Sequence, residues 1–91
     1  METNKIIITG GAARIGAAIA KKLSAPGVEI VIHYNKSKAH AEKLKKELSK
    51  NSTKVYLVKG DLSKENDLKK IVKFSKNKLK YFDCLINNAS L

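Results

Sequence analysis

The chain has 91 residues, 43% of them apolar, and a net charge of +11, which describes one small, basic, globular domain. A single cysteine, Cys84, excludes an internal disulfide and a cysteine-rich metal site and fits a reducing compartment. No apolar run approaches the roughly 20 residues of a membrane span, and the N-terminus lacks a secretory pattern, so we expect a cytoplasmic protein without a membrane partner.

The first third of the chain predicts a strand, a helix and a second strand. Asn4–Thr9 contains three successive isoleucines, the pattern of a strand buried on both faces. The apolar period then changes to that of a helix, which begins at Arg14 and ends before Pro26. The residues expected on its inward stripe are Ile15, Ala18, Ile19 and Leu23. Val28–His33 follows as a second buried strand, rich in β-branched residues.

The rest of the chain predicts two more helices and two more strands. Ser37 and Ser63 are the expected N-caps of the helices. The strands are expected at Lys54–Val58 and Asp83–Ile86. The inward residues expected are Ala41, Leu44 and Leu48 in one helix, and Leu68, Ile71, Val72 and Leu79 in the other. The last helix is expected to direct its lysines outward, at Lys64, Lys69, Lys73, Lys76 and Lys80.

Strands and helices alternate along the chain as βαβαβαβ, which predicts an α/β fold with a parallel sheet. With right-handed crossovers, the expected strand order is 3-2-1-4. A parallel strand normally has neighbours on both sides, yet the chain stops soon after its fourth strand. The sequence therefore predicts the first half of a doubly wound, Rossmann-type sheet, truncated after the fourth strand.

A run of small residues joins the first strand to the first helix: Thr9-Gly10-Gly11-Ala12-Ala13-Arg14-Ile15-Gly16. Small residues let the backbone approach a ligand closely, and the N-terminus of a helix offers free N–H groups and partial positive charge. A diphosphate suits such a turn. The run is not a Walker A loop, because Ala17 and Ala18 stand where that motif requires Lys and Ser/Thr. A tight turn that needs glycine is the alternative interpretation.

A polar segment without an acid follows the second strand: His33-Tyr34-Asn35-Lys36-Ser37. In dinucleotide-binding folds, a carboxylate near this point binds the ribose hydroxyls of NAD. Lys36 and Ser37 stand here instead, with Arg14 expected across the pocket, and that chemistry suits the 2′-phosphate of NADP. An exposed base beside a helix N-cap is the alternative interpretation of Lys36 and Ser37.

Two further motifs follow the third and fourth strands, Gly60-Asp61-Leu62 and Asn87-Asn88-Ala89. Ligands of open α/β sheets bind at the carboxyl ends of the strands, where both motifs are expected. Asp61 either accepts a hydrogen bond from an adenine amino group or starts a turn. The asparagine pair is expected to tie neighbouring strands together while its backbone borders the cofactor. All four strand-end motifs should therefore share one edge of the sheet.

The combination of Thr9-Gly10, Arg14-Ile15-Gly16, Asp61-Leu62 and Asn87-Asn88-Ala89 resembles the short-chain dehydrogenase/reductase family. Within the family, the pteridine reductase branch is similar in three features. These are the arginine in the glycine-rich turn, the His-Tyr-Asn-Lys-Ser segment, and Asn-Ala-Ser in place of Asn-Ala-Gly. The resemblance covers essentially the whole chain, but only the cofactor-binding half of such an enzyme. It implies that residues 1–91 form a single, partial NADP-binding Rossmann domain.

The resemblance also implies which residues would surround NADPH. They are Gly10, Arg14, Ile15 and Gly16 at the pyrophosphate; Lys36 and Ser37 at the 2′-phosphate, in the same segment as His33, Tyr34 and Asn35; Asp61 and Leu62 at the adenine; and Asn87 and Ala89 at the adenine ribose. Arg14 and Ser90 would also face a pterin substrate in that branch.

By the same resemblance, the family's catalytic Ser and Tyr-x-x-x-Lys lie further along and are absent here, so we expect no catalytic residue and no metal site in this chain. Tyr34 and Lys38 match the spacing, but they fall in the expected ribose-phosphate region, far from a nicotinamide. The full-length enzyme would transfer hydride from NADPH to a C=N or C=O bond of a small molecule, a pterin among the candidates. We also expect that enzyme to be a homo-oligomer.

Two other functions stay open. The same motifs suit a non-catalytic dinucleotide-binding module or a degenerate remnant of the enzyme. The charge of +11 suggests a nucleic-acid binder, but the lysines are scattered, the tyrosines do not interleave with them, and Arg14 is the only arginine. Solvated helix faces account for the charge, so we expect no nucleic-acid partner.

Overall fold

Seven elements alternate along the chain in the computed structural model, which describes residues 4–10, 12 and 14–88. The strands are β1 (Lys5–Thr9), β2 (Glu29–Tyr34), β3 (Lys54–Lys59) and β4 (Cys84–Asn87), and the helices are α1 (Arg14–Leu23), α2 (Lys38–Ser49) and α3 (Glu65–Leu79). All neighbouring strands pair in parallel, in the order β3-β2-β1-β4. The predicted alternation and strand order are confirmed, and each predicted strand boundary lies within one residue of the observed one.

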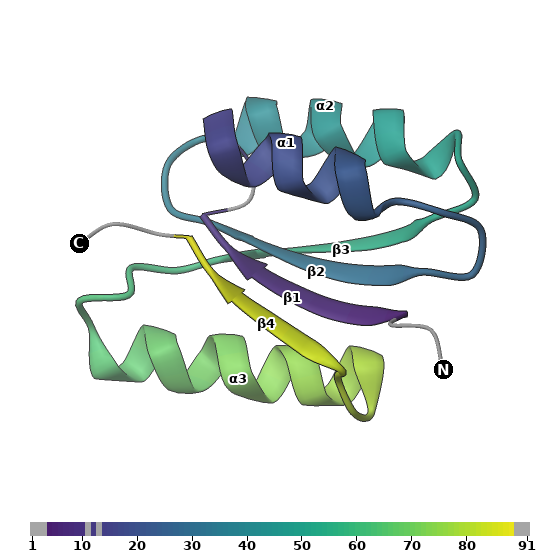
Figure 1. Cartoon of the computed structure of the whole chain (residues 1–91). Helices are drawn as coiled ribbons and strands as arrows, with labels where there is room; N and C mark the ends of the chain where they lie inside the picture. Colours follow the sequence, from purple (N-terminus) through teal and green to yellow (C-terminus); the bar gives the residue numbers. More distant parts are fainter. Residues whose placement is uncertain (1–3, 11, 13, 89–91) are drawn as a thin grey trace.

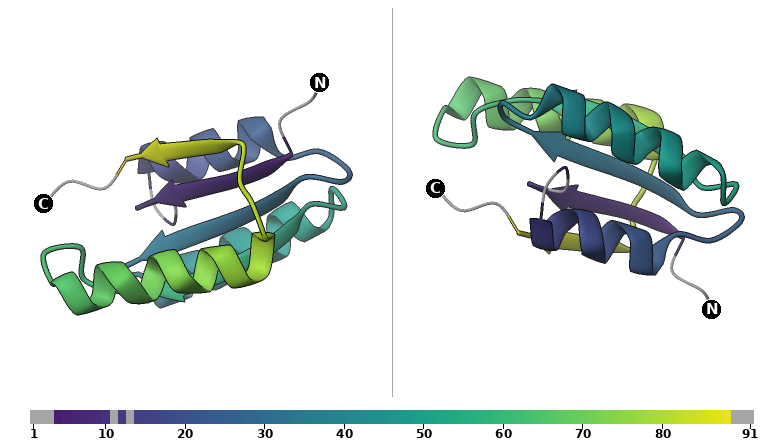
Figure 2. Two further views of the ribbon diagram at one scale, coloured as in Figure 1. Left: turned by 90° about the horizontal axis from the view of Figure 1, so that it is seen from below. Right: turned by 90° about the horizontal axis from the view of Figure 1, so that it is seen from above.

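The helices cover the two faces of the sheet unequally. Helices α1 and α2 lie together on one face, and α3 lies on the other (Figure 1). Seen from the α3 side, that helix runs along the β2–β3 half of the sheet, whereas β1 and β4 lie beside it (Figure 2). In the described part of the chain, no helix is long and apolar enough to span a bilayer.

Strand β1 owes its central position to its three isoleucines, which are all buried. Ile6 and Ile8 point into the core under α1 and α2, whereas Ile7 joins a second core cluster under α3. Side chains of a strand alternate between its faces, so a run that is apolar at every position is stable only where both faces are covered. The prediction of a strand buried on both faces is confirmed.

The inward face of α1 differs from the predicted stripe. Ile15 is 68% exposed, and Ala18 and Leu23 are also exposed, so these three predictions are wrong. The residues that face the sheet are Gly16, Ala17, Ile19 and Ala20. Small side chains one turn apart let the helix axis approach the strands closely, and the bulkier residues lie on its flanks.

Helix α3 confirms half of its predicted inward face. Ile71 and Leu79 are buried, whereas Leu68 and Val72 are 46% and 47% exposed. Because α3 lies mainly over β2 and β3, these two side chains lie at its margin rather than over the sheet. Together with neighbouring residues they border an apolar groove of about 350 Å³, lined by Ile7, Thr9, Leu62, Leu68, Ile71, Val72, Ser75, Lys76, Phe82, Leu85 and Asn87. The predicted outward lysines of α3 are all exposed.

Neither predicted serine cap makes a capping hydrogen bond. Ser37 occupies the N-cap position of α2, but its hydroxyl bonds no backbone group there. Helix α3 begins at Glu65 with Lys64 at the N-cap, so the prediction for Ser63 is wrong. The Ser63 hydroxyl instead donates to the Asp61 carboxylate, at 2.6 Å, because the chain turns tightly before the helix.

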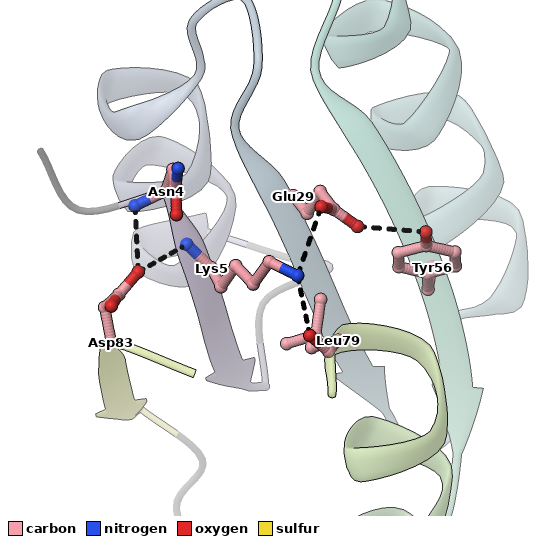
Figure 3. Close-up of polar contacts among 6 residues, drawn as sticks. All are labelled: Asn4, Lys5, Glu29, Tyr56, Leu79 and Asp83. Atoms are coloured by element: carbon pink, nitrogen blue, oxygen red, sulfur yellow. Dashed lines mark hydrogen bonds and ion pairs between the residues drawn. The ribbon is translucent and has the colours of Figure 1, made fainter. Parts of the chain in front are cut away.

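A polar network fastens the amino ends of the strands (Figure 3). The Lys5 ammonium donates to the Leu79 carbonyl at the C-terminus of α3, at 2.7 Å, and lies 3.6 Å from Glu29. The Tyr56 hydroxyl donates to the same glutamate, at 3.1 Å. The Asp83 carboxylate accepts the Lys5 N–H at 3.0 Å. A single side chain of β1 thus joins three elements, and its charge lies where the dipole of α3 is negative.

We expect the substitution Lys5→Met to lower the free energy of unfolding by about 1–3 kcal/mol, because it removes a charge-assisted hydrogen bond and leaves Glu29 without its cation. Urea unfolding followed by circular dichroism measures the loss. Lys46→Met, at an exposed position of α2, is the control and should change stability by no more than about 0.5 kcal/mol. Equal losses in the two variants would contradict the role given to Lys5.

Candidate functional site

Because all neighbouring strands are parallel, the carboxyl ends of all four strands lie at the same edge of the sheet, toward which the arrowheads of β1 and β4 point in Figure 1. The segments that follow β1, β2, β3 and β4 are the four motifs that the sequence singled out. The prediction that they share one edge is therefore confirmed, although they are far apart in sequence.

Gly10 follows β1 in a left-handed conformation, with φ of 65°, which favours glycine. Its N–H donates to His33 Nδ1 at 3.0 Å, and its carbonyl accepts from Asn88 Nδ2 at 3.1 Å. Hydrogen bonds with His33, at the end of β2, and with Asn88, after β4, thus hold the Gly10 backbone, which carries no side chain at the edge.

A pocket of about 340 Å³ lies between this run and the end of β2. Its lining residues are Gly10, Ala12, Tyr34, Asn35, Lys36 and Ser37. The described residues that line it carry one cation, two hydroxyls and an amide, and no carboxylate. The structure therefore brings the predicted pyrophosphate turn and the predicted 2′-phosphate residues onto the wall of one pocket.

The other predicted residues of the turn lie on α1. Arg14 is the first residue of the helix and is exposed, with φ of 50°. It lines an adjoining groove between α1 and α2, and Ala12 borders both that groove and the pocket. Ile15 is exposed beside it, whereas Gly16 is buried against the sheet.

Asp61 follows β3 and forms the turn that leads into α3. Its Oδ1 accepts from the Ser63 N–H at 2.9 Å and from the Ser63 hydroxyl. These bonds lower the pKa of the Asp61 carboxyl, and the charges of Lys64 and Lys36 act in the same direction, so the group stays ionised. The turn interpretation of Asp61 is confirmed, and its contact with adenine stays a prediction. Leu62 beside it packs against the core under α3.

The asparagine pair ties β4 to β1, as predicted. The Thr9 hydroxyl donates to Asn87 Oδ1 at 3.0 Å and accepts the Asn88 N–H at 3.1 Å. Asn88 also reaches the Gly10 carbonyl. The other two residues predicted for this end, Ala89 and Ser90, lie outside the described residues.

His33 lies behind the pocket rather than on its wall. The side chain is 2% exposed, and both ring nitrogens lie within hydrogen-bond distance of backbone atoms of Gly10 and Gly60. Sequence reasoning placed it among the cofactor-binding residues as the first residue of the segment from His33 to Ser37. It could not find the bonds of Thr9 and His33, because their partners come from other strands.

Comparison with known proteins identifies the family. Residues 4–91 match the family described as short chain dehydrogenase. The chain belongs to this family. Its alternating strands and helices and its parallel strand order 3-2-1-4 match the N-terminal half of the fold of this family.

Three relatives show how far the similarity extends. The short-chain dehydrogenase/reductase homolog YusS of Bacillus subtilis is 30% identical over 89 residues, covering 97% of this chain and 82% of the relative. The short-chain dehydrogenase of Oenococcus oeni PSU-1 is 38% identical with a TM-score of 0.85, over 93% of this chain and 40% of that one. FolM alternative dihydrofolate reductase 1 of Brucella canis was solved in complex with NADP. It is 32% identical with a TM-score of 0.82, over 94% of this chain and 34% of that one. The chain thus spans 40% of the first of these two solved structures and 34% of the second.

The substitution Thr9→Val should loosen the end of β4 in this short-chain dehydrogenase fold. It deletes the hydroxyl that joins Asn87 and Asn88 to β1, so we expect a loss of about 1–2 kcal/mol in unfolding free energy and faster amide exchange at Asn88. Thr9→Ser keeps the hydroxyl and is the matched control. Urea unfolding and hydrogen exchange followed by NMR measure both effects, and unchanged exchange at Asn88 would show that the hydroxyl does not hold β4.

Proposed function

We propose that this chain is the adenosine-binding half of an NADP-dependent short-chain reductase. The observation that carries the proposal is the pocket in which Gly10, Lys36 and Ser37 lie together without a carboxylate among the described lining residues. Enzymes that prefer NAD use an acid at this point to bind two ribose hydroxyls, and such an acid repels a 2′-phosphate. A cation and a hydroxyl favour the phosphate.

The residues present fit such a ligand. Gly10 carries no Cβ and lies at the edge of the pocket, so a diphosphate can approach the backbone there. Lys36 and Ser37 would hold the 2′-phosphate, and Asp61 Oδ2 would accept from the adenine amino group, since both bonds from Ser63 fall on Oδ1. Leu62 would border the adenine, and Asn87 its ribose. Bound NADPH would supply the hydride, while these residues would bind and orient it.

The activity of a longer protein is part of the same proposal. Because the chain spans 34–40% of the solved structures named above, we propose that a catalytic Ser and Tyr-x-x-x-Lys belong to a following segment, and that the full enzyme is a homo-oligomer. Reduction of a C=N or C=O bond of a small molecule would be its reaction. A pterin is the proposed substrate, supported by the arginine at position 14, the segment from His33 to Ser37, and similarity to the Brucella enzyme.

A non-catalytic dinucleotide-binding module is the second candidate. One observation favours it: this chain covers 82% of YusS, so a curated relative of nearly the same length exists. Such a module would bind NADP through the same pocket and would need no further segment.

Replacing Lys36 should weaken the binding of NADP⁺ and leave the binding of NAD⁺ nearly unchanged. In Lys36→Ala we expect about a 10-fold to 100-fold loss of affinity for NADP⁺, the range for one charge-assisted hydrogen bond, and less than about a threefold change for NAD⁺. Isothermal titration calorimetry measures both, with Lys46→Ala as an exposed-lysine control. Equal affinity of the unaltered chain for the two dinucleotides would refute the assignment of a 2′-phosphate site.

The 91-residue chain should bind NADP⁺ without catalysing reduction. Mixed with NADPH and either a dihydropterin or a simple ketone, it should leave absorbance at 340 nm unchanged, because Tyr34 borders the pocket proposed for the 2′-phosphate, where Tyr34 and Lys38 would be far from the nicotinamide. The reading frame beyond Leu91 separates the two candidates. A continuation with a Tyr-x-x-x-Lys motif would favour the reductase, and an immediate stop codon would favour the module.

A further inference from the structure

Two backbone segments of the site are joined through one buried imidazole. His33 Nδ1 accepts the Gly10 N–H at 3.0 Å, and Nε2 lies 2.7 Å from the Gly60 carbonyl oxygen. Gly10 begins the glycine-rich turn, and Gly60 precedes Asp61 at the end of β3. The ring therefore spans the gap between the β1 and β3 ends, from the strand that lies between them.

The partners of the ring determine its protonation state. A backbone N–H only donates, so Nδ1 must carry a lone pair, and a carbonyl only accepts, so Nε2 must carry the proton. Only the neutral ring with its proton on Nε2 satisfies both partners. Adding a proton at Nδ1 would place two donors against each other and leave the part-buried Gly10 N–H without its acceptor.

Both glycines at the ends of this bridge make further contacts, Gly60 with Tyr34 and α3 and Gly10 with Asn88. The Gly60 N–H donates to the Tyr34 carbonyl at 3.0 Å, and a Cβ on Gly60 would lie 2.8 Å from Ile71 Cδ1, so its backbone is pressed against α3. Gly10 has a left-handed φ and no side chain. The His33 ring thus connects the backbone that packs against α3, at Gly60, to the turn that borders the pocket, at Gly10.

Charged groups also lie on the elements that surround the ring. His33 shares a face of β2 with Val31, which packs under α3. Asp67 of α3 lies against Gly60 and accepts the Asp61 N–H, and Lys36 and Lys64 act on Asp61. On the other sides, β3 ends in the exposed Lys59, and β1 ends in uncharged residues.

We propose that His33 is a positioning residue that sets the glycine-rich turn for dinucleotide binding, so that affinity for NADP is lost when the ring becomes protonated. The inference rests on the proposed function, because it concerns the same pocket. The neutral ring holds the turn. The affinity for NADP should therefore be highest where the ring is neutral, and it should fall as acidification adds a proton to the ring.

The test is the affinity of the whole chain for NADP⁺ between about pH 8 and pH 5, the range in which histidines change charge. The 2′-phosphate of NADP⁺ also titrates in this range, so the comparison needs a variant with a side chain that does not titrate. His33→Gln retains an amide that both accepts and donates, and His33→Phe retains ring volume without either nitrogen. His40→Gln removes the other imidazole of the chain as a control, because His40 is exposed and lines the groove between α1 and α2 rather than the pocket.

At pH 8 we expect His33→Gln to bind NADP⁺ within about threefold of the unaltered chain and His33→Phe about tenfold more weakly, as for the loss of one or two hydrogen bonds. On acidification the unaltered chain and His40→Gln should lose about fivefold to tenfold more affinity than His33→Gln. A slope in the unaltered chain no steeper than in His33→Gln would overturn the inference, even if NADP⁺ binds well.

NMR of the unaltered chain without ligand gives an independent answer. The ¹⁵N shifts of the His33 ring should report a bare Nδ1 and a protonated Nε2 at pH 8. Protection of the Gly10 amide from exchange should disappear at the same midpoint as the ring titration. A ring protonated on Nδ1 at pH 8 would overturn the inference. Absence of NADP⁺ binding at pH 8 together with the expected NMR result would instead overturn the proposed function, so the two failures are distinguishable, even if His33→Phe does not fold.

Discussion

The parallel pairing of β1 with both β2 and β4 is the constraint on which the rest of the structure depends. Ile7 lies opposite Val31 on one side and Leu85 on the other, so the backbone of β1 is bonded along both edges. Parallel pairing aligns the directions of all strands, and the crossover connections then place helices on the faces. The same constraint gathers four short polar segments at one edge, although none of them is next to another in sequence.

The two edges of the sheet are stabilised by different chemistry. At the amino edge, long charged side chains make the connections, and Lys5 alone reaches the carbonyl end of α3 and Glu29. At the carboxyl edge, short side chains bond backbone atoms, as Thr9 and Asn88 do. Such bonds keep the turns fixed without filling the space above them. That division leaves the glycine backbone and Lys36 accessible, which a binding edge requires and a purely structural edge does not.

Much of this arrangement could be predicted from the sequence because it follows from local rules. Three adjacent isoleucines predict a doubly covered strand, and alternating elements with right-handed crossovers predict the strand order. Helix periodicity located the apolar residues of α1 and α3, but it did not predict which of them contact the sheet. Ile15 is exposed because Gly16 and Ala20 face the sheet instead, and Val72 is exposed because α3 lies mainly over β2 and β3. The bond between His33 and Gly60 crosses 27 positions and leaves no periodic signal.

Local placement rather than net charge decides what this edge can bind. Most of the lysines behind the charge of +11 lie on outward helix faces, where salt screens them. Lys36 differs because it borders the pocket at the carboxyl edge of the sheet, beside Gly10, and also acts on Asp61, whose carboxylate Ser63 keeps ionised. A phosphate at Lys36 would therefore share this cation with a fixed anion, so its affinity depends on how the turns hold the two apart. On the proposed function, the bonds that fix Gly10, Gly60 and Asp61 would contribute to the selectivity of the site, although none of them would touch the phosphate.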